Sequence, residues 1–132
     1  IKYSDFIKLS DEEIKIITKE EDLVKGIKAL HNMGAKVVAI TLGSKGTLIS
    51  TKEYSKIVSS IEIEQVDSTG AGDAFVGAVL KQIANQEEKN NISFDKWIDI
   101  VFYANVVGAI TCTNYGAIDS MPEEKDLHIV FQ

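Results

Sequence analysis

Cysteine and proline are nearly absent from this sequence of 132 residues, which contains one of each, Cys112 and Pro122. A single cysteine excludes an internal disulfide framework and a zinc site built on cysteines. No apolar run approaches the roughly 20 residues that a membrane-spanning helix requires, and the first residues contain no apolar signal region. We therefore expect a soluble protein in a reducing, cytoplasmic compartment.

Positive charge is also scarce, since 14 lysines and arginines stand against 20 acidic residues, which gives a net charge of −6. Nucleic acid and anionic membranes both require a basic face, so we expect neither as a partner. The hydrophobic share of 45% is enough for a real core, and the length predicts a single domain. The sequence begins with Ile1 rather than methionine and is patterned almost at once, which suggests a piece of a longer protein.

The first part of the chain is predicted to contain a short extended segment over residues 5–9 and then a helix. Ser10 and Glu13 have the spacing of a capping box, in which each residue satisfies a backbone N–H of the first helical turn. Apolar residues continue at helical spacing toward Gly34, where we expect the helix to end.

Strands are predicted to follow that helix. The apolar run Val37–Leu42 indicates a central strand buried on both faces, of the kind found in parallel sheets covered by helices. Residues 47–50 predict another strand, and residues 56–64 predict one or two more.

The second half of the chain is predicted to be helical. One helix begins near Gly72 and ends at about Gln86, and a long helix begins at Ser93 or Asp95. Pro122 suits the first position of a last short helix. Helix, buried strand, further strands and then helices together predict an α/β fold.

The strongest chemical signal is the segment Val66–Phe75, with the sequence VDSTGAGDAF. Gly70 and Gly72 stand just before a helical pattern, where backbone N–H groups can converge on an anion. Asp73 would repel such an anion unless its carboxylate has a task, and accepting a proton from an attacking hydroxyl is one.

A plainer interpretation of the same segment is a tight glycine turn, with Asp73 stabilising the start of its own helix. Two familiar nucleotide motifs do not fit the segment. No Gly-Lys-Ser/Thr tripeptide occurs, which excludes a Walker A loop, and Phe75 occupies the third glycine position of the dinucleotide fingerprint.

A second glycine turn, Thr41–Gly46, follows the predicted buried strand. Ligands of open α/β sheets bind at the carboxyl ends of strands, so this turn is a candidate phosphate contact. An ordinary hairpin turn is the alternative.

These segments together are similar to the PfkB/ribokinase family of carbohydrate kinases. The resemblance rests on the stretch Asp67–Asp73, on Thr41–Gly46, on Lys8–Glu13, on Phe102–Asn105 and on Thr113–Ile118. It covers essentially the whole chain and is greatest for the fructokinase branch. It implies the C-terminal portion of a ribokinase-like fold, a layered sheet with helices on both faces.

The resemblance also implies a function and the roles of several residues. Over residues 1–132 it implies the ATP-binding and catalytic part of a kinase that phosphorylates a sugar hydroxyl, with fructose the leading substrate. Asp73 matches the general base, and Gly70, Ala71 and Gly72 match the anion hole for the transferring phosphoryl group. The residues that match the ATP contacts are Thr41, Gly43, Ser44, Gly46 and Asn105.

The metal residues implied by the resemblance are Glu13 and Asp67. Glu13, together with Ser10, matches a motif that organises Mg²⁺ through water, although Ser10 stands where the motif more often has Asn. Asp67 matches a residue of the monovalent-cation site, so K⁺ is a further candidate cofactor. A capping role for Ser10 and Glu13, and a loop-capping role for Asp67, remain open.

The resemblance further implies that an N-terminal sugar-binding part and lid are absent from this sequence, and that the complete protein forms a homodimer through that lid. The chain alone is then expected to be inactive. Three alternatives remain: a kinase of another sugar, sugar phosphate or nucleoside; a nucleotide-binding module without catalysis; and a purely structural fragment.

Other residues are weaker candidates. His31 and His128 have no metal-ligand partner at suitable spacing, and Cys112 is expected to be an inert buried thiol. Lys45 could reach a phosphate, although a lysine in a turn is usually solvated. The aromatic residues Phe94, Trp97 and Phe102 follow helical spacing and are expected in the core.

Overall fold

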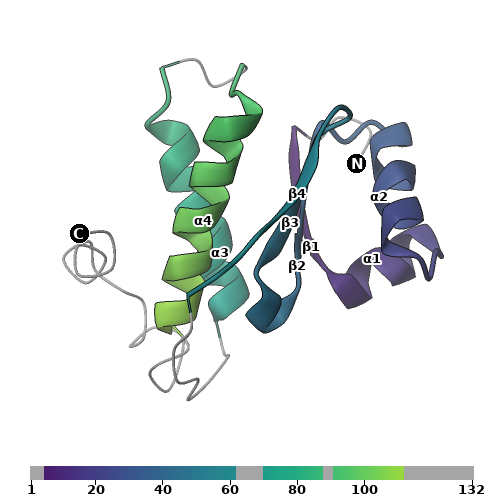
Figure 1. Cartoon of the computed structure of the whole chain (residues 1–132), viewed down its shortest axis with the longest axis horizontal. Coiled ribbons are helices and arrows are strands. Elements are labelled where there is room, and N and C mark those ends of the chain that lie inside the picture. The colour runs from purple at the N-terminus through teal and green to yellow at the C-terminus, as the bar shows by residue number, and fades with distance from the viewer. Residues whose placement is uncertain (1–4, 62–69, 88–90, 112–132) are drawn as a thin grey trace. The chain divides into compact units, whose positions relative to one another are not determined.

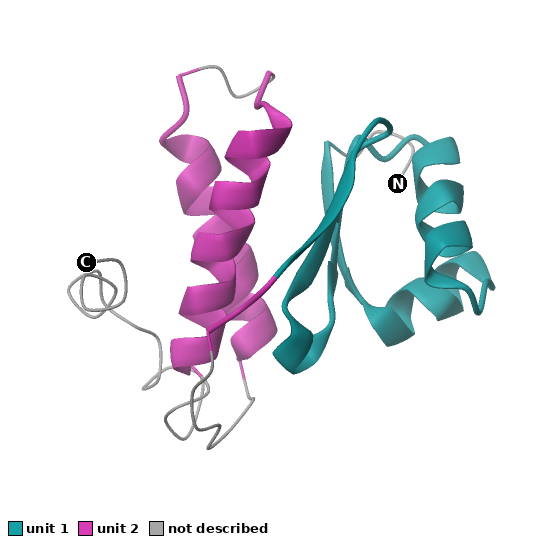
Figure 2. Ribbon diagram, in the orientation of Figure 1, with its two compact units in different colours: residues 1–58 teal, residues 59–132 magenta. Residues whose placement is uncertain are grey.

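A computed structural model describes residues 5–61, 70–87 and 91–111 of the chain. The chain divides into two compact units, residues 1–58 and residues 59–132 (Figure 2). Unit 1 contains a sheet and two helices, and the described part of unit 2 contains a pair of helices (Figure 1).

The sheet of unit 1 has four strands in the order β1-β2-β3-β4. The strands are β1 (Phe6–Ser10), β2 (Val37–Thr41), β3 (Thr47–Ser50) and β4 (Ser55–Val58). β1 and β2 run parallel, whereas β2 with β3 and β3 with β4 are antiparallel. The sheet is therefore mixed: a short turn joins β2 to β3, and only a longer crossover could make them parallel.

β2 has the buried interior position that its sequence predicts. It lies between β1 and β3, and Val37, Val38, Ala39 and Ile40 are all buried. Thr41 is partly exposed where the strand ends. The predicted strand at 47–50 is confirmed as β3, whereas β4 covers only the first part of the predicted 56–64 segment. Ile61 lies outside any strand, and residues 62–64 lie outside the described residues.

Two helices, α1 (Asp11–Thr18) and α2 (Leu23–Asn32), follow β1 where the apolar spacing suggested one continuous helix. Lys19 has a left-handed backbone with a φ of 58°, which ends α1. The Asp22 side chain then accepts hydrogen bonds from the N–H groups of Val24 and Lys25 and begins α2. Apolar residues have helical spacing on both sides of this break, so their spacing alone does not reveal it.

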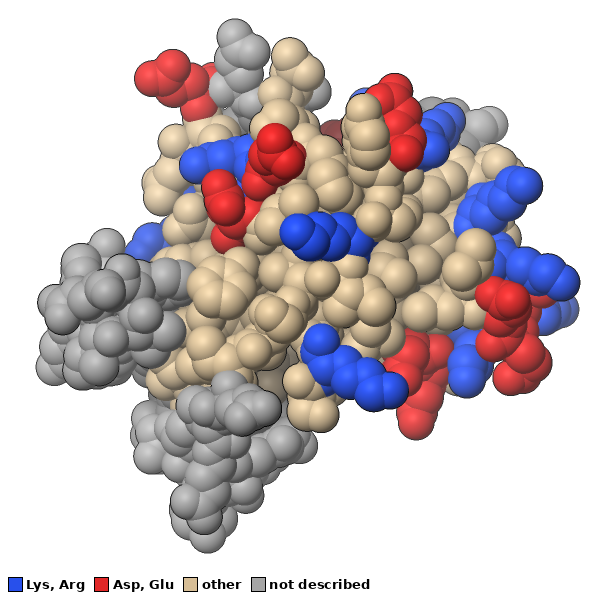
Figure 3. All heavy atoms as spheres, in the orientation of Figure 1, with Lys and Arg blue, Asp and Glu red and all other residues tan. Residues whose placement is uncertain are grey.

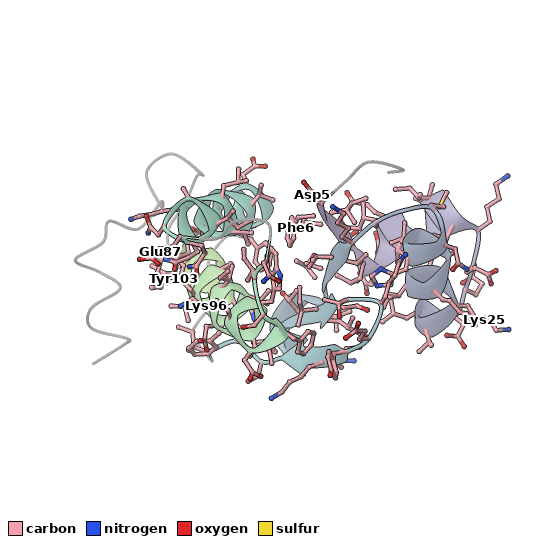
Figure 4. The ribbon with its side chains drawn as sticks, turned by 90° about the horizontal axis from the view of Figure 1, so that it is seen from above. Asp5, Phe6, Lys25, Glu87, Lys96 and Tyr103 are labelled. Carbon is pink, nitrogen blue, oxygen red and sulfur yellow. The ribbon has the colours of Figure 1, made fainter. Side chains whose placement is uncertain are left out.

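One face of the sheet forms the core of unit 1 with these two helices. The buried side chains of this core are Leu9, Ile14, Ile27, Leu30, Ala35, Val38 and Ile40. Within the sheet, Leu9 is paired with Ile40, so the two side chains stand on the same face. The charged side chain of Lys25 on α2 points away from the sheet (Figure 4).

The described part of unit 2 is built from α3 (Ala71–Ala84) and α4 (Phe94–Thr111), which pack against each other (Figures 1 and 4). Ser93 caps α4, because its Oγ accepts a hydrogen bond from Lys96 N at 3.2 Å. Trp97 is buried, as its spacing predicts, whereas Phe94 and Phe102 are only partly buried. The predicted helix after Pro122 lies outside the described residues.

Charge on the surface is mixed in sign. On the face drawn in Figure 3, lysines and acidic side chains lie interspersed over the described residues. A helix long and apolar enough to cross a membrane does not occur among the helices of the described ranges.

Candidate active site

One edge of the sheet in unit 1 gathers several of the predicted site residues. The pairing register places Ser10, Thr41, Thr47 and Val58 in one row across the four strands. This row contains the carboxyl ends of β1, β2 and β4. The carboxyl edge of a sheet is where ligands of open α/β proteins bind.

The Gly43–Gly46 turn lies directly beyond this row. It is a short 3₁₀ helix, Gly43–Lys45, closed by hydrogen bonds from Leu42 N to Gly46 O at 2.9 Å and from Gly46 N to Gly43 O at 3.1 Å. Gly43 has a φ of 64° and Gly46 a φ of 101°, backbone conformations that favour glycine. The turn does join two antiparallel strands as a hairpin, and it exposes Gly43, Ser44 and Lys45 at the carboxyl edge.

The first turn of α1 lies at the same edge, because Ser10 ends β1 and also caps the helix. Ser10 Oγ accepts from Glu13 N at 3.1 Å, and Glu13 Oε2 accepts from Ser10 N at 2.7 Å, so the predicted capping box is confirmed. The hydrogen bond from the Ser10 backbone holds the pKa of Glu13 below its ordinary value, with a further contribution from the charge of Lys8. Glu13 is exposed and therefore presents a fully ionised carboxylate at neutral pH.

The start of α3 differs from that of the other helices. α1, α2 and α4 each begin with a side chain that caps the first backbone N–H groups. α3 follows Gly70, which has a φ of 81° and no side chain to offer, and its N-cap carries no side-chain hydrogen bond. Among the described residues, no side chain caps the first N–H groups of α3, which lie at the positive end of the helix dipole and can bind an anion.

Asp73 lies in this first turn of α3 and is exposed. Because Ala74 N donates to Gly70 O at 2.9 Å, the helix begins directly at the glycine. An exposed carboxylate therefore stands beside N–H groups that can hold an anion, which is an arrangement suited to taking a proton from a hydroxyl near a phosphoryl group.

Asn105 is buried in α4, with 7% of its surface exposed. Its side-chain amide donates from Nδ2 to Ser59 O at 3.3 Å, and its main-chain carbonyl accepts from Ser60 Oγ at 3.4 Å. The residue thus binds the segment that directly follows β4. The predicted contact with ATP stays a prediction.

The structure brings together the predicted residues of unit 1, namely Ser10, Glu13, Thr41, Gly43, Ser44 and Gly46, at one sheet edge. Gly70, Ala71, Gly72, Asp73 and Asn105 belong to unit 2. Asp67, Cys112 and His128 lie outside the described residues.

His31 has a structural place, as its isolated position suggested. It is buried at the end of α2, with Nδ1 2.8 Å from Ala35 O and Nε2 3.0 Å from Ser50 Oγ. Nδ1–H donates to the Ala35 carbonyl, which can only accept, and Nε2 shares a hydrogen bond with the Ser50 hydroxyl. Both ring nitrogens are engaged, which leaves none for a metal.

Comparison with known proteins identifies the family. The domain of pfkB family carbohydrate kinases matches residues 1–124, and the chain belongs to this family. Among curated relatives, fructokinase-1 of Zea mays is 36% identical over 94% of this chain. Probable fructokinase-6, chloroplastic, of Arabidopsis thaliana is 35% identical over 95% of it.

Solved structures agree with this assignment. A double mutant of fructokinase from Vibrio cholerae O395, bound to fructose, ADP and potassium ion, matches with a TM-score of 0.90 and 33% identity over 97% of this chain. Ribokinase from Thermotoga maritima matches with a TM-score of 0.86 and 26% identity over 98% of the chain. The expected ribokinase-like α/β fold is thus confirmed.

The chain spans only part of these relatives. It covers 38% of the Zea mays fructokinase, 33% of the Arabidopsis protein, 41% of the Vibrio structure and 43% of the Thermotoga structure.

Proposed function

We propose that this chain is the ATP-binding and catalytic part of a sugar kinase, in which Asp73 acts as general base. The reaction transfers the γ-phosphoryl group of ATP to a sugar hydroxyl and releases ADP. Fructose is the leading substrate, giving fructose 6-phosphate, because the fructokinases are relatives at 33–36% identity.

The observation that carries this proposal is the start of α3. Gly70 precedes the helix in a left-handed conformation, no side chain of the described residues caps it, and Asp73 stands exposed in its first turn. A helix start that only stabilised itself would gain from a serine or aspartate cap, which is worth roughly 0.5–2 kcal/mol. A phosphoryl group that binds the Gly70–Gly72 N–H groups accounts for a helix start that no described side chain caps.

The remaining ATP contacts are proposed at the carboxyl edge of unit 1. Gly43 and Ser44 are exposed in the turn that Gly46 closes, and Thr41 ends the adjoining strand. Asn105 is proposed to contact ATP from unit 2. This chain contains no arginine, so the groups that it offers to phosphate charge are backbone N–H groups, lysines such as Lys45 and a bound metal.

Glu13 is proposed to hold Mg²⁺ through water. Its exposed carboxylate is ionised and fixed by Ser10, which fits an outer-sphere role for a hard divalent cation. When bound, Mg²⁺ neutralises charge on the phosphates. Asp67 is proposed as a ligand of K⁺, which the related Vibrio fructokinase binds.

The complete protein is proposed to be longer than this chain, since the chain covers about two-fifths of its solved relatives. The missing N-terminal part would supply most sugar contacts and a lid, through which we propose a homodimer. We propose no nucleic-acid or membrane partner, and we place the protein in the cytoplasm. A nucleoside is a second candidate substrate, because a related riboside kinase from Salmonella enterica has a TM-score of 0.87.

The test of this function is Asp73→Asn in the complete protein, assayed with ATP, Mg²⁺ and fructose. General-base assistance is typically worth about 10²–10⁴-fold, so kcat is expected to fall by that factor. The dissociation constant for ATP should stay equal or decrease slightly, because a negative charge near the phosphates is removed.

Glu87→Gln is the matched control, since Glu87 is an acidic residue after the far end of α3. It should leave kcat unchanged. Near-normal turnover of Asp73→Asn would return Asp73 to a capping role. An unmodified complete protein that binds ATP but phosphorylates none of fructose, ribose and nucleosides would instead identify a binding module.

A further inference from the structure

α4 contacts both segments that flank residues 62–69 on the two sides. Asn105 holds the segment before them, through Nδ2 to Ser59 O at 3.3 Å and through its own carbonyl to Ser60 Oγ at 3.4 Å. Three residues later, Gly108 faces the segment after them. A Cβ at Gly108 would lie 3.3 Å from the carbonyl oxygen of Ala71, the first residue of α3.

The spacing of Asn105 and Gly108 places both residues on one side of α4. Positions i and i+3 are neighbours on a helix surface, so the face of α4 that binds Ser59 also abuts Ala71. Both residues are buried. Position 108 combines burial with direct contact to backbone, which leaves no flexible side chain there to absorb a shift.

We propose that α4 positions the start of α3 for phosphoryl transfer. Gly108 is the positioning residue, because it sets how closely Ala71 approaches α4. The inference rests on the proposed function, because it assigns the task to the helix start that would hold the phosphoryl group. Asn105 fixes the incoming segment, and Gly108 fixes the outgoing one. Neither role requires contact with substrate.

The physical consequence of filling position 108 is a small displacement. A contact of 3.3 Å between Cβ and a carbonyl oxygen is tighter than ordinary packing, so α3 must move away by a few tenths of an ångström. The N–H groups of Gly70–Gly72 move with Ala71. A misplacement of about 1 Å can cost about 10²-fold in rate, so this smaller shift should cost about tenfold.

The experiment compares Gly108→Ala with Gly77→Ala in the complete protein. Gly77 lies in α3, is exposed, and has no atom within 4 Å of a Cβ placed there. Both substitutions exchange a helical glycine for alanine and raise helix propensity equally. Only Gly108→Ala should lower kcat, by about tenfold, with a smaller change in KM for fructose, and the unfolding temperature of each variant shows that it remains folded.

Hydrogen–deuterium exchange at residues 70–75 provides a readout that does not depend on activity. We expect faster exchange there in Gly108→Ala and unchanged exchange in Gly77→Ala. In Asn105→Asp the carboxylate cannot donate to Ser59, so exchange should rise at residues 59–61.

These readouts separate the two proposals. An unmodified protein without kinase activity overturns the proposed function, while the exchange data still decide whether Gly108 positions α3. Unchanged exchange at 70–75 in Gly108→Ala overturns the positioning role. So does an active protein in which Gly108→Ala and Gly77→Ala turn over equally fast.

Discussion

At the scale of single residues, the carboxylate of Glu13 has both a capping role and a proposed metal-binding role. Its Oε2 accepts from Ser10 N at 2.7 Å and completes the capping box. The same group is the proposed holder of Mg²⁺ through water. The two roles are compatible, because the carboxylate is exposed and the box uses one oxygen.

The pKa of Glu13 gives this residue a testable signature. The Ser10 backbone hydrogen bond lowers it from 4.5 in the folded protein. A lowered folded pKa contributes stability that is present above the unfolded pKa and is lost as pH falls through the folded pKa. Glu13→Gln keeps an acceptor at this position without the charge.

We expect the unfolding temperature of the wild type to exceed that of Glu13→Gln at pH 7 and to approach it as the pH falls through the lowered folded pKa of Glu13. The difference is small, since the group is exposed to solvent. In the kinase assay of the complete protein, Glu13→Gln should raise the Mg²⁺ concentration required for half-maximal rate. Glu12→Gln, in the same helical turn but outside the box, is the control for both measurements. A stability difference independent of pH would contradict the assigned hydrogen bond.

At the scale of elements, local chemistry in the sequence was sufficient to place most helices and strands. The capping box at Ser10, the buried strand β2 and the glycine start of α3 each depend on residues within a few positions. The break between α1 and α2 could not be read in this way. Lys19 adopts a left-handed conformation that its side chain does not favour, and Asp22 restarts the helix.

Two glycines in open surroundings allow the backbone contribution of an element to be measured by itself. Gly43 in the turn has a φ of 64°, and Gly77 lies within α3; a Cβ would meet no atom within 4 Å at either position. Gly43→Ala should lower the free energy of unfolding by about 1 kcal/mol, the cost of a left-handed non-glycine residue. Gly77→Ala should raise it by roughly 0.5–1 kcal/mol, because helical glycine is entropically costly.

Chemical denaturation of the two variants and the wild type measures both changes. Since neither alanine creates a clash, the opposite signs can come only from backbone conformation. Equal effects of the two substitutions would show that the Gly43 conformation carries no cost in the folded protein.

At the scale of the whole molecule, the sequence could predict the site residues only in separate groups. Parallel pairing of β1 and β2 brings Ser10 beside Thr41, a pairing that the sequence alone does not predict. The contact between Gly108 and Ala71 joins positions 37 residues apart. Because glycine has no side chain, nothing in the sequence marks position 108 as a contact.

ATP itself can test whether the two glycine segments form one site. The Gly43–Gly46 turn lies in unit 1 and the start of α3 lies in unit 2, so a ligand that touches both must be shared. In the complete protein, ATP with Mg²⁺ should slow hydrogen–deuterium exchange at residues 42–47 and at residues 70–75. In a titration with ATP, protection of the two segments should rise with the same concentration dependence. Bound ligand stabilises the groups that it contacts in proportion to its occupancy. Adenosine, which has no phosphates, is the control, and it should leave residues 70–75 unprotected. Protection of one segment alone would mean that a single nucleotide does not contact both. If residues 70–75 stay unprotected, no phosphate lies beside Asp73, and its assignment as the general base is wrong.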